Sequence, residues 1–259
     1  MLLTVLGCSG SVPGPESPAS GYLIRAGATT VVLDLGNGTL GALQRYVDPF
    51  GLDALILSHL HPDHCADVSA LTVYRRYHPQ RPSGHRLALH GPSVLADRLA
   101  AAYATSAAER AETDLSDVYD FRPFCVSGPD PVRIGTLELR AALVDHPCEA
   151  YAVRVSQADA VLVYSGDTGP CRALVELAGG ADVLLAEASW PDQANNPPGI
   201  HLSGREAGQI AAEAGVGRLL ITHVPPWTDA EQMRAEAGAV FNGPVELVRA
   251  GADYEIGAG

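Results

Sequence analysis

Basic side chains are scarce in this sequence. Lysine and arginine together number 17, against 30 aspartates and glutamates in 259 residues, and the formal net charge is −13. A long polyanion such as tRNA would meet a repulsive average field around such a chain. The composition therefore argues against a large nucleic-acid footprint, unless a local basic patch or bound cations offset the charge.

Cysteines and long apolar runs are also scarce. The five cysteines are odd in number and scattered, so we expect no disulfide framework and a reducing, cytoplasmic location. No segment approaches the roughly 18 consecutive apolar residues of a membrane span. Residues 1–7 lack the basic segment that opens a signal peptide and are typical of a first strand. We therefore expect a protein without membrane association.

Charged residues make up only 18% of the chain, whereas apolar residues make up 47%. That balance excludes a disordered chain and supplies a sizeable core. Strand-like and helix-like segments alternate in the first half, and the same pattern returns in the second half without a low-complexity linker between them. We expect residues 1–259 to form a single domain in which two α/β halves pack sheet to sheet, with helices outside.

The apolar periodicity gives approximate bounds for these elements. Strands are expected at residues 2–6, 21–26, 29–35, 54–57, 86–90, 132–144, 150–155, 160–165, 183–186, 219–222 and 245–249. Helices are expected at residues 39–47, 67–77, 93–103, 171–177 and 229–240. Ser203 and Glu206 have the spacing of a capping box, which predicts a further helix up to about residue 214.

A dense group of metal-binding residue types follows the strand expected at residues 54–57. His59, His61, Asp63 and His64 fall within six residues, so they cannot share one face of a helix or strand. They must lie on a turn at the carboxyl end of the strand, where alternate side chains can converge. His59 and His61 can then bind one ion while Asp63 and His64 reach another. Neutral imidazole and carboxylate suit zinc, manganese or iron.

Three more candidate ligands follow later strands. His146 comes after the apolar run that ends at residue 144, Asp167 follows the strand at 160–165, and His223 follows the strand at 219–222. Each alone could be an ordinary polar residue at the end of a strand. Their shared position favours a common site, because open α/β sheets place their sites at the carboxyl ends of strands.

The motif His-x-His-x-Asp-His, followed in order by His, Asp and His, resembles the metallo-β-lactamase superfamily along the whole chain. Further stretches at residues 6–10, 146–151, 165–170, 186–189 and 201–203 resemble its ribonuclease Z-like phosphodiesterase branch. Residues 17–22, 75–79, 201–204 and 225–228 are similar to actinobacterial cyclic AMP phosphodiesterases of this fold. The resemblance implies a four-layer αββα sandwich with two divalent metal ions.

The resemblance also implies a role for individual residues. The first ion would be bound by His59, His61 and His146, the second by Asp63, His64 and His223, and Asp167 would bridge both. Two ions roughly 3.5–4 Å apart can activate water and clamp both oxygens of an in-line displacement. 

Four residues would act around the ions. Asp63 would also aim the attacking water, and His201 would hydrogen-bond the phosphoryl oxygen and help to protonate the leaving oxygen. Glu187 would orient His201. Asp34, at the end of a strand, would brace the histidine turn, as partners behind metal ligands do.

Hydrolysis of 3′,5′-cyclic nucleotides such as cyclic AMP to 5′-monophosphates is the function that these features favour. The alternative is a ribonuclease Z-type tRNA 3′-endonuclease, which the same motifs would serve. Many such enzymes grip tRNA with a long basic arm after the third metal histidine, but here only five residues separate Val155 from Val161. A thioesterase, lactonase or β-lactamase is supported only by the fold.

Other features of the sequence stay open. A metal- or nucleotide-binding scaffold without turnover would share the motifs, although the complete ligand set argues against it. Trp190 and Trp227 lie beside site segments, where either could stack on a base or simply pack against the core or rim. The native metal, the preferred base and a homodimeric state are not determined by the sequence.

Overall fold

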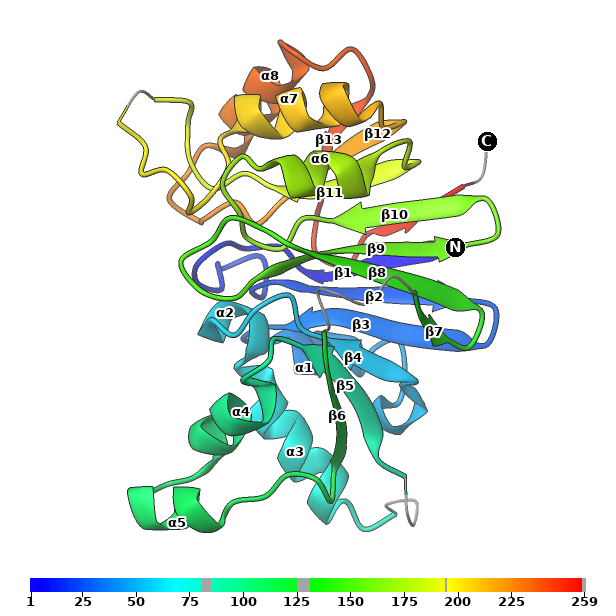
Figure 1. Ribbon diagram of the computed structural model, residues 1–259, viewed down its shortest axis with the longest axis vertical. Coiled ribbons are helices and arrows are strands. Elements are labelled where there is room, and N and C mark those ends of the chain that lie inside the picture. Colours follow the sequence, from blue (N-terminus) through cyan, green and yellow to red (C-terminus); the bar gives the residue numbers. More distant parts are fainter. Residues whose placement is uncertain (81–84, 125–130, 194, 258–259) are drawn as a thin grey trace.

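Two seven-stranded mixed sheets pack face to face in the computed structural model, which describes residues 1–80, 85–124, 131–193 and 195–257. Helices cover the outer face of each sheet (Figure 1). This is the four-layer αββα sandwich expected from the sequence.

The first sheet has the spatial order β14 (Asp253–Glu255), β1 (Leu2–Gly7), β2 (Gly21–Ala26), β3 (Thr29–Leu35), β4 (Ala54–Ile56), β5 (Leu87–Gly91) and β6 (Tyr119–Pro123). The second has the order β13 (Val245–Leu247), β12 (Arg218–Thr222), β11 (Val183–Glu187), β10 (Ala160–Tyr164), β9 (Tyr151–Gln157), β8 (Leu137–Leu143) and β7 (Val132–Ile134). In both sheets, a run of antiparallel strands is followed by a run of parallel ones, β3 to β6 and β10 to β13.

The helices divide between the two outer layers. The first sheet carries α1 (Thr39–Leu43), the short 3₁₀ helix η1 (Pro49–Gly51), α2 (Pro62–Cys65), α3 (Asp67–Tyr77), α4 (Leu95–Tyr103) and α5 (Ala107–Glu112). The second carries α6 (Arg172–Ala178), α7 (Gly204–Ala214) and α8 (Ala230–Gly238), at the top of Figure 1. The capping box predicted at Ser203 and Glu206 is present at the start of α7.

Alternation along the strands builds three apolar layers between the four layers of secondary structure. Leu33 and Leu185 lie in the cluster between the sheets, whereas their neighbours Val32 and Leu184 lie in the clusters under the helices. Successive side chains of a strand point to opposite faces, so each central strand serves two cores. Because these strands are buried on both faces, their sequences are continuous apolar runs.

Several expected elements differ from those observed. The single strand expected at residues 132–144 is a hairpin, because Gly135 takes a positive φ of 54° and turns the chain between β7 and β8. Strands β6 and β14 and helix α5 were not expected. The strands lie at sheet edges and are rich in charged residues, and α5 buries no side chain.

The connection between β9 and β10 is as short as the sequence indicated. Only residues 158 and 159 separate the two strands, and Ala158 takes a φ of 48° to close the hairpin. No long arm can emerge there. Among the described residues, no helix combines the length and apolar character needed to cross a bilayer.

Candidate metal centre

The candidate site lies at one edge of the sandwich, where strands of both sheets end. His59 and His61 follow β4, and Pro62 begins the short helix α2, which carries Asp63 and His64. Proline at the first helical position needs no hydrogen-bond acceptor for its nitrogen, so the helix can start directly after the turn. The predicted turn therefore exists, with two histidines before the helix and two candidate ligands on it.

Close backbone approaches fix this turn. A Cβ atom on Gly36 would lie 1.9 Å from the carbonyl oxygen of Asp63, so only glycine lets the end of β3 pack against α2. On the opposite side, His223 follows β12 with a φ of 55°. A non-glycine residue rarely adopts this conformation, and surrounding contacts must hold it.

Three histidines form a first donor cluster. The Nδ1 atom of His61 lies 3.0 Å from His59 Nε2 and 3.2 Å from His146 Nε2. His59 is fully buried, while His61 is exposed. One ion could sit among these three nitrogens, which is the grouping that the resemblance implied.

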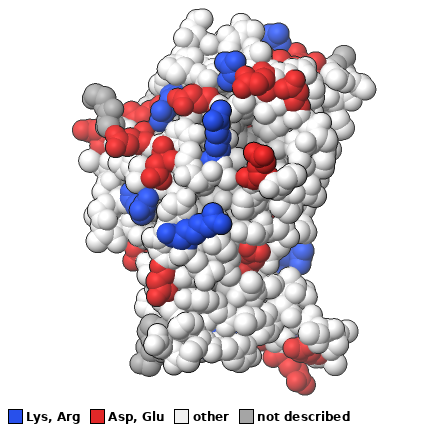
Figure 2. Space-filling model, turned by 180° about the vertical axis from the view of Figure 1, so that it is seen from behind, with Lys and Arg blue, Asp and Glu red and all other residues white. Residues whose placement is uncertain are grey.

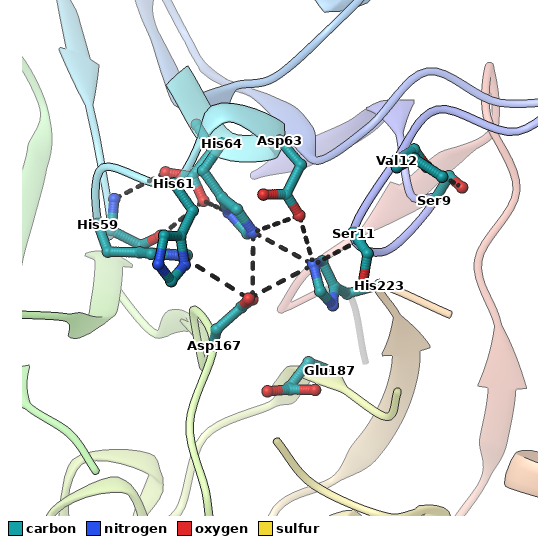
Figure 3. A network of polar contacts seen from close by, with 12 residues as sticks. Ser9, Ser11, Val12, His59, His61, Asp63, His64, Asp167, Glu187 and His223 are labelled. Atoms are coloured by element: carbon teal, nitrogen blue, oxygen red, sulfur yellow. Dashed lines mark hydrogen bonds and ion pairs between the residues drawn. The ribbon is translucent and has the colours of Figure 1, made fainter. Parts of the chain in front are cut away.

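Asp63, His64, Asp167 and His223 form a second cluster, with donor atoms within 4.8 Å of one another. His223 Nε2 lies 3.2 Å from both His64 Nε2 and Asp63 Oδ2. Asp167 lies between the clusters, 3.2 Å from His64 Nε2 through Oδ1 and 3.7 Å from His59 Nε2 through Oδ2 (Figure 3). The structure thus brings all seven predicted ligands together.

The outer nitrogens of His59, His146 and His223 are occupied. Nδ1 of His146 donates to the carbonyl oxygen of Ile200, at 2.8 Å. Nδ1 of His59 lies 3.1 Å from Ser58 Oγ, and Nδ1 of His223 lies 3.0 Å from Ser189 Oγ. Both hydroxyls donate to carboxylates and therefore accept from the histidines. With the proton on the outer nitrogen, the inner nitrogen keeps its lone pair for a metal.

Asp34 anchors the turn from behind. It is fully buried, with a φ of 56°, and accepts hydrogen bonds from Ser58 N, Ser58 Oγ and Tyr164 OH, each at 2.7 Å. Nδ1 of His64 lies 2.8 Å from Asp34 Oδ2. Because Tyr164 belongs to the second sheet, this carboxylate also connects the two sheets directly behind the second cluster.

Burial and close neighbours shift the pKa values of the clustered histidines and aspartates. Burial lowers the pKa of His59 well below its usual range, helped by the neighbouring His64. Burial opposes ionisation of Asp167, but the charges of His223, His64 and His59 hold its pKa well below the usual range. The pKa of His64 is raised well above its usual value, because Asp167 and Asp34 outweigh its burial.

The donor set fits divalent metal ions. The inward atoms are imidazole nitrogens and carboxylate oxygens, the ligand types that zinc and its neighbours prefer. The buried Oδ1 of Asp167 accepts no well-aligned hydrogen bond from any described residue, although His64 Nε2 is 3.2 Å away. A metal ion would be coordinated by this oxygen and by the imidazole nitrogens whose lone pairs face one another.

A third group lies beside the second cluster. Nδ1 of His201 lies 2.9 Å from Oε1 of Glu187, which is fully buried and also accepts from Thr168 N. Burial opposes protonation, yet the charge and hydrogen bond of Glu187 raise the pKa of His201 to about 9. The predicted pair is thus in contact, and Nε2 is the nitrogen of His201 that stays available.

Some site residues were not found from the sequence. Ser189 links Glu187 to His223, since its hydroxyl donates to Glu187 Oε2 and lies 3.0 Å from His223 Nδ1. Tyr164 reaches Asp34 from the other sheet. Ser189 follows Glu187 closely in the chain, which is a usable signal, but nothing in the sequence relates Tyr164 to Asp34.

Both tryptophans border a cavity of about 600 Å³ that also includes His201. The Trp190 ring meets the His201 ring edge-on, with centroids 5.2 Å apart. Trp227 is 69% exposed and is therefore not a core residue.

Weakening the brace behind His64 is expected to weaken metal binding. In Asp34→Asn, one carboxylate oxygen becomes an amide group that cannot accept from Tyr164 or His64. Loss of such a partner commonly costs about 10–100-fold in metal affinity or activity. Titration with zinc should report this loss. Tyr164→Phe, which removes one hydrogen bond and keeps the shape, should give a smaller loss, and unchanged affinity in both variants would contradict the bracing role.

Comparison with known proteins identifies the family of the chain. A family model described as a β-lactamase superfamily domain matches residues 29–224. An uncharacterized protein of Mycobacterium leprae is 54% identical over 258 residues, which cover 99% of this chain and 89% of that protein. A ribonuclease Z of Mycolicibacterium paratuberculosis is 34% identical, covering 95% of this chain and 94% of that protein.

A solved structure extends the likeness to three dimensions. The probable metallo-hydrolase YhfI of Bacillus subtilis is 31% identical in sequence, covering 98% of this chain and 100% of that protein. Its crystal structure superimposes with a TM-score of 0.85 at 28% identity, over 98% of each chain. The chain therefore belongs to the metallo-β-lactamase superfamily, and its relatives fit the ribonuclease Z-like branch of the metallo-hydrolases.

Proposed function

We propose that this protein is a two-metal phosphodiesterase that hydrolyses 3′,5′-cyclic nucleotides, foremost cyclic AMP, to 5′-monophosphates. The observation that carries the proposal is the pair of donor clusters on either side of Asp167. Divalent ions, with zinc, manganese or iron as candidates, would activate water there and offset the charge of the phosphate. The residues that would hold them are His59, His61 and His146 for one ion, Asp63, His64 and His223 for the other, and Asp167 for both.

Two side chains of the protein, Asp63 and His201, would then act on the attacking water and on the leaving oxygen. In the reaction, the oxygen of water bonds to phosphorus, the P–O3′ bond breaks, and O3′ takes up a proton. Asp63, on α2 and in the second cluster, would also accept a hydrogen bond from the attacking water and aim it. His201 would donate from Nε2 to the phosphoryl oxygen or to O3′, while Glu187 fixes its ring through Nδ1.

The surface supports a small substrate over a long nucleic acid. Many arginines are paired with acidic neighbours, for example Arg76 with Asp117 and Arg205 with Asp192. On the face shown in Figure 2, basic side chains lie among acidic ones and form no continuous basic area. Together with the net charge of −13 and the two-residue turn between β9 and β10, this leaves little to hold a tRNA.

A tRNA 3′-endonuclease is the second candidate. The relative named ribonuclease Z, 34% identical over nearly the whole chain, favours it. Thioesters, lactones and β-lactams have no comparable support beyond the fold.

A substrate panel separates the candidates. We expect the metal-loaded protein to hydrolyse cyclic AMP measurably and to process pre-tRNA little at physiological salt, because the turn between β9 and β10 carries no arm and the net charge of −13 repels RNA. Cyclic AMP, cyclic GMP, 2′,3′-cyclic nucleotides and pre-tRNA should be compared on one preparation, with Asp63→Ala as the control for contaminating enzymes. Efficient pre-tRNA cleavage without turnover of cyclic nucleotides would reverse the ranking.

A further inference from the structure

The cavity beside His201 extends away from the donor clusters, toward the start of α8. Its volume of about 600 Å³ lies within the roughly 300–1,000 Å³ typical of small-molecule sites. His201 belongs both to this cavity and to the polar site, since its ring centroid lies 5.5 Å from that of His223. A substrate whose phosphate lies at the clusters could therefore place its remaining part in the cavity.

The walls of the cavity are aromatic and apolar. Trp190 and Trp227 line it together with Pro191, Pro225 and Ile200. When a flat ring stacks on an exposed tryptophan, apolar surface is removed from water, which favours binding. Any nucleobase can supply such a ring.

The polar rim of the cavity is oriented by hydrogen bonds. Nε2 of Gln232 donates to Glu236 Oε1 at 2.9 Å, and the other oxygen of Glu236 accepts from Asp192 N at 3.0 Å. An ionised carboxylate can only accept hydrogen bonds, so Glu236 binds the amide nitrogen of Gln232. The amide oxygen of Gln232 then remains available to a ligand in the cavity. Asp229, whose Oδ1 caps α8, contributes a second oxygen that can only accept.

This rim distinguishes the two purines. Adenine carries an amino group on C6, which donates, whereas guanine carries an oxygen there, which accepts. The oxygens of Gln232 and Asp229 could accept from the amino group, whereas the guanine oxygen would face these acceptors without a hydrogen to share. Gln232 and Asp229 are exposed and bind water in the free protein, so the discrimination would come from the C6 oxygen of guanine, which would give up its water to face acceptors.

We propose that this cavity is a nucleobase subsite, in which Trp227 stacks on the ring and Gln232, held by Glu236, selects 6-aminopurines over 6-oxopurines. The inference rests on the proposed function, since it places the base of the same nucleotide whose phosphate meets the donor clusters. Gln232 is a specificity-determining residue in this scheme and takes no part in the reaction.

Binding and turnover test the subsite separately. The 5′-monophosphates AMP and GMP should be titrated into the zinc-loaded protein by calorimetry, and kcat/KM measured for cyclic AMP and cyclic GMP. We expect wild type to prefer adenine by about tenfold or more in both assays. Gln232→Ala should bring the ratios close to one and keep hydrolysis of bis-p-nitrophenyl phosphate, which has no base. Gln209→Ala, an exposed glutamine of α7 that lies outside this cavity, is the matched control and should keep the preference.

The outcomes distinguish the two proposals. Equal binding of AMP and GMP by wild type, or an unchanged ratio in Gln232→Ala, would overturn the subsite even if both cyclic nucleotides are hydrolysed. Preferential, Gln232-dependent binding of AMP without hydrolysis of any cyclic nucleotide would support the subsite and overturn the proposed phosphodiesterase function.

Discussion

Replacing Asp63 by alanine is expected to lower turnover by on the order of 10³-fold or more. The change removes an oxygen of the second donor cluster, which lies 3.2 Å from His223 Nε2, and also the group proposed to aim the attacking water. Loss of a partner behind a ligand already costs about 10–100-fold, and loss of a positioned acid or base about 10²–10⁴-fold. Elemental analysis should show fewer than the two ions per chain expected for wild type.

The ion count makes this experiment decisive for the two-metal scheme. Wild-type protein that has been carefully reconstituted should contain two transition-metal ions per chain. If it contains one ion or none, or if Asp63→Ala keeps wild-type turnover, the scheme is wrong. A circular dichroism spectrum of the variant that matches wild type would exclude unfolding as the cause of a lost activity.

Replacing His201 by alanine should slow turnover by about 10²-fold or more while both ions remain bound. Turnover should fall because the variant lacks the group that donates to the phosphoryl or leaving oxygen. Loss of such a group usually slows a reaction by about this factor. Both ions should remain because Nδ1 of His201 is held at 2.9 Å by Glu187, which is outside the seven proposed ligands, and lies farther, at 3.8 Å, from Asp167 Oδ2.

The leaving group offers a sharper readout for His201. A phosphodiester with a p-nitrophenolate leaving group needs little protonation, so the variant should lose less activity on it than on a cyclic nucleotide. Glu187→Gln should cause a smaller loss of the same kind, since the amide can still contact the ring. An unchanged kcat in His201→Ala would remove this residue from the mechanism.

The clustering of the candidate ligands was the most predictable feature of the molecule. Four metal-binding residue types within residues 59–64 restrict the backbone to a turn, and later candidates such as Asp167 and His223 were found because parallel strands end at one edge of a sheet. The αββα layers followed from alternating strand and helix patterns. The grouping of the ligands came from the resemblance to a known family.

The supporting contacts were less predictable. The bond between Asp34 and Tyr164 joins two sheets across a sequence separation of 130 residues, and no local pattern encodes such a pair. The positive φ of Asp34 and His223 depends on tertiary packing. Strand β14 is short and charged, and pairs with β1 only because the chain returns to the first sheet. Gln232 became informative only when its partner Glu236 was visible.

Both donor clusters draw on both halves of the chain. The first combines His59 and His61 with His146, and the second combines α2 with residues that follow β10 and β12. An ion in either cluster would therefore add a cross-link between halves that also meet through the apolar layer between the sheets, the Asp34–Tyr164 hydrogen bond and the pairing of β14 with β1. Metal binding would then stabilise the association of the two halves. Fragments of the chain divided between β6 and β7 would reassociate more tightly when metal is present.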